Sequence, residues 1–341
     1  MKGIIIAGGV VLFLVLLVGL AWQFGSKAKA RLAARHPPLG QMVDVGGYRL
    51  HIACQGEGRP GAPTIVLETP NGESGLIWAA VQPEVAKFAR VCTYDRAGLG
   101  WSDKSPKPRT VEAITDELAV LLERAGVKPP YVLVGNSIGG LYARYYAHRH
   151  PDQVVGMVLV DATHEEQTAR FPAALQRVQQ QSQKMMVFGM RLFAKLNAIG
   201  ILALLAEGGR IAWPTPLPES VREAYVGLAC ADSKSFEAIA DETAAAEGNI
   251  AAVAAARITT LGDIPLAVLA AGQTPISAGR GISAADVEQF KALAPRLQAE
   301  LAALSPRGKL VVTEKSGHYI QVDQPELVVA AIREVVAAAR R

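Results

Sequence analysis

Ser137 is the residue whose type and setting point most directly to chemistry. It stands in the segment 135–139 (GNSIG), between an apolar stretch at 131–134 and a helical pattern at 138–148. A serine that is lifted off a sheet edge by a sharp strand-to-helix turn needs small residues two positions before and after it, and the two glycines supply them. The following helix directs its N-terminus at the same point, where its field favours a developing anion. The pattern predicts a nucleophilic serine.

A serine hydroxyl becomes a good nucleophile only when a base removes its proton, so we consider the six histidines in turn. His318 follows the strand expected at 309–312, which puts it at the carboxyl edge of the sheet together with Ser137. We therefore predict His318 as the base. His164 opens a long insertion and is also expected near the pocket. The others lie beside the N-terminal apolar run, in an early strand or at a helix end: His36, His51, His148 and His150.

The base in turn needs an acid that fixes its tautomer and stabilises its charged form. Asp161 directly follows the apolar strand expected at 154–160, so it faces the same edge of the sheet. We predict Asp161 as this acid. Asp286 is the alternative, although it falls in a segment with helical spacing, 284–304.

Strands and helices alternate along most of the chain, which predicts a parallel sheet covered on both faces. The expected strands are 42–45, 48–53, 64–68, 90–94, 131–134, 154–160, 264–271 and 309–312. The expected helices are 77–89, 111–125, 138–148, 284–304 and 325–339. We therefore assign one α/β core to residues 41–163 and 263–341.

Residues 164–262 interrupt this alternation with helical patterns and no convincing strand. Their centre, from Met185 to Trp213, is apolar. We interpret the segment as a helical cap on the sheet domain. Its apolar centre has two alternative interpretations, an acyl pocket or a surface that contacts lipid.

The N-terminal 22 residues contain an uncharged apolar run of 20 residues, Gly3 to Trp22. A helix of that length spans about 30 Å, the thickness of a bilayer core. We predict a transmembrane anchor at 1–24 and a basic linker at 25–40. A cleavable signal peptide is the alternative, although its apolar region is usually only about 7–15 residues long. Four cations follow the run, and the positive-inside rule then places the body of the protein in the cytoplasm.

The charge distribution and the cysteines restrict the remaining possibilities. The net charge is +4, but residues 1–36 hold five Lys and Arg and no acid, so the remaining chain carries −1. A nearly neutral body argues against nucleic acid as a partner. The three cysteines, Cys54, Cys92 and Cys230, predict neither a disulfide framework nor a metal site, and we expect small buried hydrophobic residues.

Several of these features together resemble the α/β-hydrolase superfamily. The first is the order of Ser137, Asp161 and His318 along the chain, and the second is the turn around the serine. The others are the segments 95–103 (DRAGLGWSD) and 316–326 (SGHYIQVDQPE). The resemblance implies an eight-stranded, mostly parallel sheet with a cap over the active site. It also implies acyl transfer to water through a serine ester, with no cofactor and no metal.

The sequence departs from the family pattern at two places. The family usually has His-Gly after its third strand, whereas this chain has Thr69-Pro70. Because proline has no N–H, the oxyanion donors are expected to be the backbone N–H groups of Asn71 and Ile138. The acid is expected at Asp161 because the turn 272–275 (GQTP), after a later strand, has no carboxylate.

These features predict a membrane-anchored serine hydrolase that acts on a hydrophobic carboxylic ester. The expected partners are a small-molecule ester and membrane lipid. A serine in place of an aspartate nucleophile argues against haloalkane dehalogenase and epoxide hydrolase chemistry. A hydrolase-fold protein that binds a ligand without catalysis is an alternative. C–C bond hydrolases and cofactor-free haloperoxidases share the same triad and are alternatives among enzymes.

Overall fold

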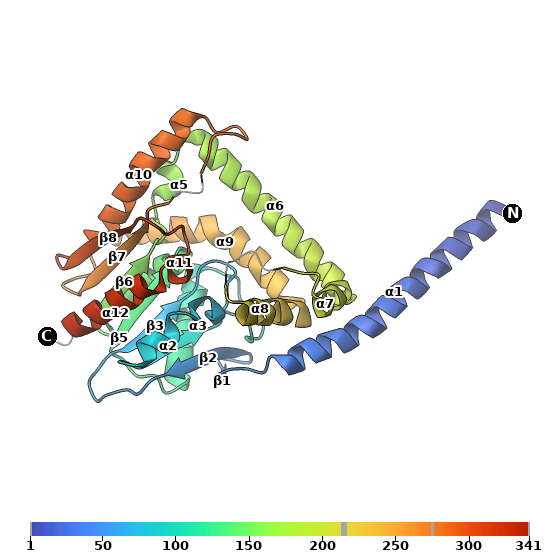
Figure 1. Ribbon diagram of the computed structural model, residues 1–341, viewed down its shortest axis with the longest axis horizontal. Helices are drawn as coiled ribbons and strands as arrows, with labels where there is room; N and C mark the ends of the chain where they lie inside the picture. The colour runs from blue at the N-terminus through green and yellow to red at the C-terminus, as the bar shows by residue number, and fades with distance from the viewer. Residues whose placement is uncertain (1, 213–216, 274–275, 340–341) are drawn as a thin grey trace.

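The computed structural model of the protein describes residues 2–212, 217–273 and 276–339. An eight-stranded sheet forms its centre, in the order β1-β2-β4-β3-β5-β6-β7-β8 (Figure 1). β3 to β8 run parallel to one another, while β2 is antiparallel to both β1 and β4. The strands are β1 (Gln41–Asp44), β2 (Arg49–Gln55), β3 (Thr64–Glu68), β4 (Val91–Tyr94), β5 (Tyr131–Asn136), β6 (Val154–Val160), β7 (Leu266–Ala271) and β8 (Gly308–Thr313). The predicted mostly parallel sheet is confirmed.

Helices cover both faces of this sheet. One face packs against apolar side chains of α3 (Val111–Arg124), α4 (Ile138–Arg149) and α10 (Ala284–Ala302). The other packs against η1 (Gly75–Trp78), α2 (Gln82–Ala86), α11 (Ile320–Asp323) and α12 (Pro325–Ala339). The helix expected at 77–89 is wrong in its extent, because Pro83 lacks an N–H and sits in the first turn of a new helix, α2.

Between β6 and β7 the described residues form helices and no strand: α5 (Gln167–Arg170), α6 (Ala173–Ala198), α7 (Ile201–Glu207), α8 (Glu219–Ala231) and α9 (Lys234–Ala256). α6 packs along α9, and α9 lies between α6 and the sheet domain (Figure 1). Trp213, the end of the predicted apolar centre, lies outside the described residues, as do residues 274 and 275 of the turn 272–275.

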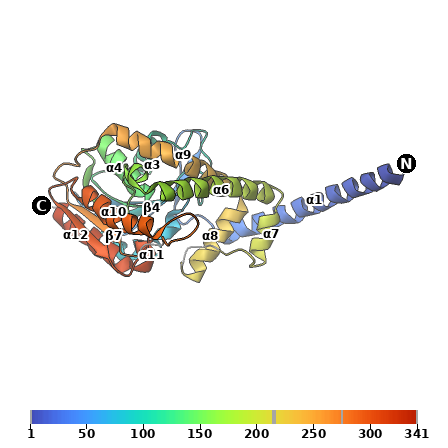
Figure 2. The ribbon, with the colours of Figure 1, turned by 90° about the horizontal axis from the view of Figure 1, so that it is seen from above.

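The N-terminal apolar run is part of one long helix, α1 (Lys2–Arg35), which projects from the body of the molecule (Figures 1 and 2). Among the described helices, α1 is long and apolar enough on its own to cross a bilayer. The residues that we expected to form a linker from 25 onward continue this helix to Arg35. The reason is local: residues 26–35 contain neither Gly nor Pro, and the helix ends just before Pro37.

Cys54 and Cys92 form a disulfide bond, which corrects our prediction of unbonded cysteines. The antiparallel register of β2 and β4 places these two residues directly opposite each other. Spacing along the chain does not reveal this pairing, because β3 lies between the two strands in the chain but not in the sheet. Cys230 is buried and free, as expected of a small core residue.

Candidate active site

Ser137 occupies a strained turn between β5 and α4. Its φ of 57° and ψ of −128° lie outside the regions that L-residues ordinarily adopt. The turn is closed so tightly that a Cβ on Gly135 would come within 2.6 Å of the backbone at Gly139. A Cβ on Gly139 would lie 2.5 Å from the Thr69 carbonyl oxygen, so both flanking positions require glycine. This geometry presents the serine at the end of a central strand, as the segment 135–139 predicts.

His318 and Asp161 form a hydrogen-bonded pair across the sheet edge. Nδ1 of His318 lies 2.6 Å from Oδ2 of Asp161. Oδ1 of Asp161 accepts a second hydrogen bond, 3.1 Å long, from the Ala271 N–H at the end of β7. Both carboxylate oxygens therefore face donors, which orients the carboxylate and makes Nδ1 the protonated nitrogen of a neutral imidazole. Nε2 is left as the nitrogen available to a serine hydroxyl.

These three residues line one cavity of about 440 Å³, a size typical of small-molecule sites. No hydrogen bond joins the Ser137 hydroxyl to His318 within the part of the chain that the structure describes. Catalytic hydrogen bonds are often long or open when no substrate is bound. Most of the remaining lining is apolar and comes from α5, the beginning of α6, and α10, including Phe171, Leu175, Val178, Phe290 and Leu297. The cavity thus joins a polar end, which holds Ser137, Asp161 and His318, to an apolar chamber.

Asp286, the alternative acid, has a structural task elsewhere. Its carboxylate accepts hydrogen bonds from the N–H and the hydroxyl of Ser283, and this capping box begins α10. His51 is likewise occupied: it is buried and its Nδ1 lies 3.0 Å from Oδ2 of Asp95. Neither residue lines the cavity.

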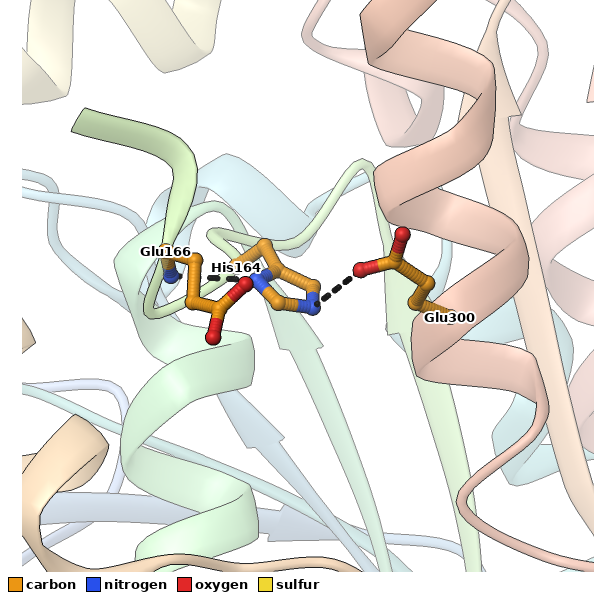
Figure 3. A group of neighbouring side chains, drawn as sticks. All are labelled: His164, Glu166 and Glu300. Atoms are coloured by element: carbon orange, nitrogen blue, oxygen red, sulfur yellow. Dashed lines mark hydrogen bonds and ion pairs between the residues drawn. The ribbon is translucent and has the colours of Figure 1, made fainter. Parts of the chain in front are cut away.

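His164 forms a group with Glu166 and Glu300 whose ligand atoms lie within 4.8 Å of one another (Figure 3). Its Nδ1 accepts the backbone N–H of Glu166 at 3.1 Å, so Nε2 carries the proton of the neutral ring. Nε2 then lies 3.4 Å from Glu300, which also holds Arg170 at 2.6 and 2.9 Å. Burial lowers the pKa of His164 and outweighs the neighbouring carboxylates, which keeps the ring neutral. Neither ring nitrogen of His164 has a lone pair free for a metal.

A comparison with known families matches residues 65–331 to the Alpha/beta hydrolase family. The chain belongs to this family. The AB hydrolase superfamily protein of Gibberella zeae is 25% identical over 312 residues, 86% of this chain and 92% of that protein. An esterase from Thermogutta terrifontis shares the fold, with a TM-score of 0.59 and 22% identity over 88% of this chain and 97% of that one.

Other relatives match only in part. An uncharacterized vacuolar membrane protein of Saccharomyces cerevisiae is 31% identical over 134 residues, 35% of this chain and 21% of that protein. The chain spans 20% and 15% of the length of two more curated relatives. The match over residues 65–331 supports a hydrolase enzyme, and the partial matches carry no further functional conclusion.

In this α/β-hydrolase the loop after β3 is held by a buried arginine that we did not predict as functional. Arg96 donates to the backbone carbonyls of Thr69 and Pro70 at 2.8 and 2.7 Å. The same guanidinium pairs with Glu68 at 2.6 Å and with Glu242 of α9 at 2.8 Å. Arg96 therefore connects the loop to the cap. Its position in the segment 95–103 was the available signal, but its partner Glu242 lies 146 residues away.

Glu242 also accepts the N–H of Gly72 at 3.1 Å, and Asn71 donates from its side chain to Thr243 of α9 at 2.9 Å. Burial by itself raises the pKa of the Glu242 carboxyl, but Arg96 outweighs this effect and holds that pKa below its ordinary value. The backbone N–H groups of Asn71 and Ile138 donate to no partner among the described residues. Neither residue is among those that line the cavity. Ile138 follows Ser137 directly, and the close approach of Gly139 to Thr69 places the loop next to the serine turn.

Asn136, beside the serine, is a second residue whose role we did not predict. Its side-chain amide donates to the carbonyls of Val160 and His318 at 2.7 and 3.1 Å. Its oxygen accepts from Gln321 at 3.0 Å. Asn136 is fully buried, so these bonds satisfy its amide and tie the serine turn to the histidine loop.

The acyl-pocket interpretation of residues 185–213 is not supported by the cavity. Among the described residues of that stretch, none lines it; the apolar lining comes from the other end of α6 and from α10. Instead, Met185, Phe188 and Leu192 are exposed to solvent.

Proposed function

We propose that this hydrolase cleaves carboxylic esters through an acyl-enzyme on Ser137, with His318 as the base and Asp161 as the acid. The observation that carries the proposal is the meeting of three features in one cavity. These are a serine on a strained turn, an imidazole whose tautomer is fixed by a carboxylate 2.6 Å away, and an apolar chamber beside them.

The reaction follows from the donors and acceptors. The Ser137 hydroxyl attacks the ester carbonyl while Nε2 of His318 takes its proton. The backbone N–H groups of Asn71 and Ile138 hold the oxyanion, helped by the N-terminus of α4. His318 then protonates the leaving alcohol. Water attacks the acyl-enzyme, giving its proton to His318, and the acid is released as the hydroxyl of Ser137 is restored.

The cavity supports a hydrophobic acyl group as the preferred substrate. Phe171 and Phe290 pack edge to face with ring centroids 5.2 Å apart, and Leu175 and Val178 extend the apolar lining. Each methylene that enters such a chamber contributes about 0.8 kcal/mol. An aliphatic ester should therefore be hydrolysed with a kcat/KM that rises with acyl length until the chamber is filled.

A serine-directed fluorophosphonate tests the proposal. We expect it to add to the wild type at Ser137, as seen by intact-mass and peptide mass spectrometry. Ser137→Ala should not be labelled, and His318→Gln should be labelled far more slowly while keeping the fold by circular dichroism. Ser316, which lies in the histidine loop, gives a matched control: Ser316→Ala should still be labelled. A folded wild type that resists labelling would contradict the proposal.

We further propose that α1 anchors the enzyme in a membrane and is not removed. Its last turns are built into the cap: Ala28 and Leu32 are buried among apolar residues of α6, α7 and α8. A cleaved leader would leave this part of the cap uncovered. The disulfide between Cys54 and Cys92 favours an oxidising compartment for the catalytic domain, because such bonds are rare in reducing ones. The flanking cations predict the opposite side, and labelling of an exposed cysteine on the catalytic domain in intact cells separates the two.

A further inference from the structure

The outer face of α6 carries a stripe of apolar side chains that the protein leaves uncovered. Met185, Phe188 and Leu192 are spaced three and four residues apart, so they share one side of the helix. Their exposed fractions are 65%, 67% and 43%, whereas Ala194 and Asn197 are buried. Large apolar residues gathered on one exposed side usually mark a binding surface.

The charges of α6 indicate what this surface binds. The helix contains Arg177, Lys184, Arg191 and Lys195 and no Asp or Glu. A cationic helix with exposed Met, Phe and Leu is typical of one that lies at a lipid–water interface, where the cations meet anionic headgroups.

The anchor holds α6 in the position that this role requires. Gly25 of α1 touches Gly200, which joins α6 to α7, so closely that a Cβ on either would lie 2.3 Å from the other's Cα. Lys29 donates to the Ala198 carbonyl at 3.4 Å, and Arg31 pairs with Glu207 at 2.5 Å. α1 is thus fixed to the cap without a hinge.

These contacts between α1 and the cap set the depth of α6 relative to the bilayer. Gly25 comes three residues after Trp22, the end of the apolar run, so the contact with Gly200 lies where the hydrocarbon ends. In Figure 1, α6 runs crosswise to α1, on the side of the molecule from which α1 projects, with α9 on the side of the sheet. Figure 2 also shows the sheet and α1 at opposite ends of the molecule. With α1 across the bilayer, α6 lies along its surface.

We propose that α6 rests on the bilayer that α1 crosses, with Met185, Phe188 and Leu192 inserted at the interface. The beginning of α6 supplies Leu175 and Val178 to the cavity of Ser137. The helix therefore links the lipid surface to the catalytic chamber. Resting on the proposed ester hydrolysis, this arrangement names the substrate class: esters of long acyl chains that are dissolved in the membrane.

Lipid-borne quenching tests the placement without using activity. The full chain, with Phe188→Cys carrying an environment-sensitive fluorophore, is reconstituted in phosphatidylcholine and phosphatidylglycerol vesicles that contain doxyl-labelled lipid. Lys309→Cys on β8, an exposed site outside the cap, is the matched control. The disulfide and the burial of Cys230 keep background labelling low. We expect the probe at 188 to be quenched several-fold more than the probe at 309.

Equal quenching at the two sites overturns the proposal, and so does a probe at 188 that neither doxyl lipid nor a water-soluble quencher reaches. In the second case another protein or a second copy of the chain covers the stripe.

Kinetics then test the substrate class. Replacing Met185, Phe188 and Leu192 together by Ser should lower kcat/KM for a long-chain ester held in vesicles by about fivefold or more, since interfacial binding scales with the inserted apolar area. It should leave kcat/KM for a short soluble ester unchanged. An equal loss on both esters, or none on the vesicle ester, overturns the inference. If the wild type cleaves neither ester, the proposed hydrolysis fails, while the quenching result still decides where α6 lies.

Discussion

Replacing Asp161 by Asn tests the least expected residue of the proposed triad. Both oxygens of the carboxylate accept hydrogen bonds, one from His318 and one from the Ala271 N–H. An amide has the same shape but only one acceptor oxygen, so one of these donors must face its NH₂ group. The imidazole then loses either its orientation or the tautomer that leaves Nε2 free to accept the serine proton.

The fall in kcat/KM expected for Asp161→Asn follows from the loss of two interactions of the carboxylate with His318. A hydrogen bond to a charged group contributes about 1.5–3 kcal/mol. The attraction between the carboxylate and the imidazolium that forms during the reaction is about 4 kcal/mol at an effective dielectric constant of 20. Because the His318 side chain is 41% exposed, solvent screens this term, and we reduce it by about half. The sum, about 3–5 kcal/mol, predicts a fall in kcat/KM of about two to four orders of magnitude.

The fall in kcat/KM is measured by hydrolysis of p-nitrophenyl esters by the wild type and by Asp161→Asn. Fluorophosphonate labelling is a second readout of serine reactivity. Asp286→Asn is the matched control, because it makes the same chemical change at the other candidate acid. It should weaken the capping box that begins α10 and leave kcat/KM within about twofold. Activity within about threefold of the wild type in folded Asp161→Asn would refute the reasoning, as would a large loss in Asp286→Asn alone.

Three further predictions concern the cap, the chamber and the membrane side. Glu242→Gln should lower the unfolding free energy at neutral pH by about 1–3 kcal/mol, since it removes a charge partner of buried Arg96. Folding lowers the pKa of Glu242, so the ionised carboxylate stabilises the folded protein above the ordinary glutamate pKa, and this stabilisation is lost as the pH falls below it. In urea titrations from pH 7 to 3, the unfolding free energy should therefore fall less steeply with acid in the variant than in the wild type. Val178→Phe narrows the chamber and should cost about fourfold in kcat/KM for each methylene excluded, seen as a shift of the preferred acyl length to shorter esters. In intact cells, a membrane-impermeant maleimide should label Lys309→Cys if the catalytic domain faces the oxidising side of the membrane. Labelling only after lysis would support the cytoplasmic side, which the flanking charges predict.

The parallel core was predictable from the sequence because its signals are local. β6 is a continuous apolar run, and α12 begins at Pro325, the residue at which we expected it to begin. The carboxyl ends of parallel strands meet at one edge, so the ends of β5, β6 and β8 are expected to lie close together. The positions of Ser137, Asp161 and His318 at one cavity follow from this rule.

What could not be predicted depends on contacts between distant segments. The strand order β2-β4-β3 puts Cys54 opposite Cys92, and only the register reveals the bond. Charge predicts a boundary between the span and a linker near residue 25. Helix propensity after Gly25 instead keeps the backbone helical, and Glu207 of the cap pairs with Arg31.

The sheet itself gives a physical reason why Asp161 suits the role of the proposed acid. The turn after β7 has no carboxylate in its described residues, Gly272 and Gln273, but β7 ends with Ala271, whose N–H donates to Asp161 at the end of β6. Asp161 reaches this N–H from a left-handed backbone, φ 42°, a conformation that aspartate tolerates better than most residues. β7 therefore supplies the donor that orients the proposed acid. A carboxylate at Asp161 without that donor would have a free oxygen and a choice of rotamers, so the proposed role depends on β7 as well as on β6.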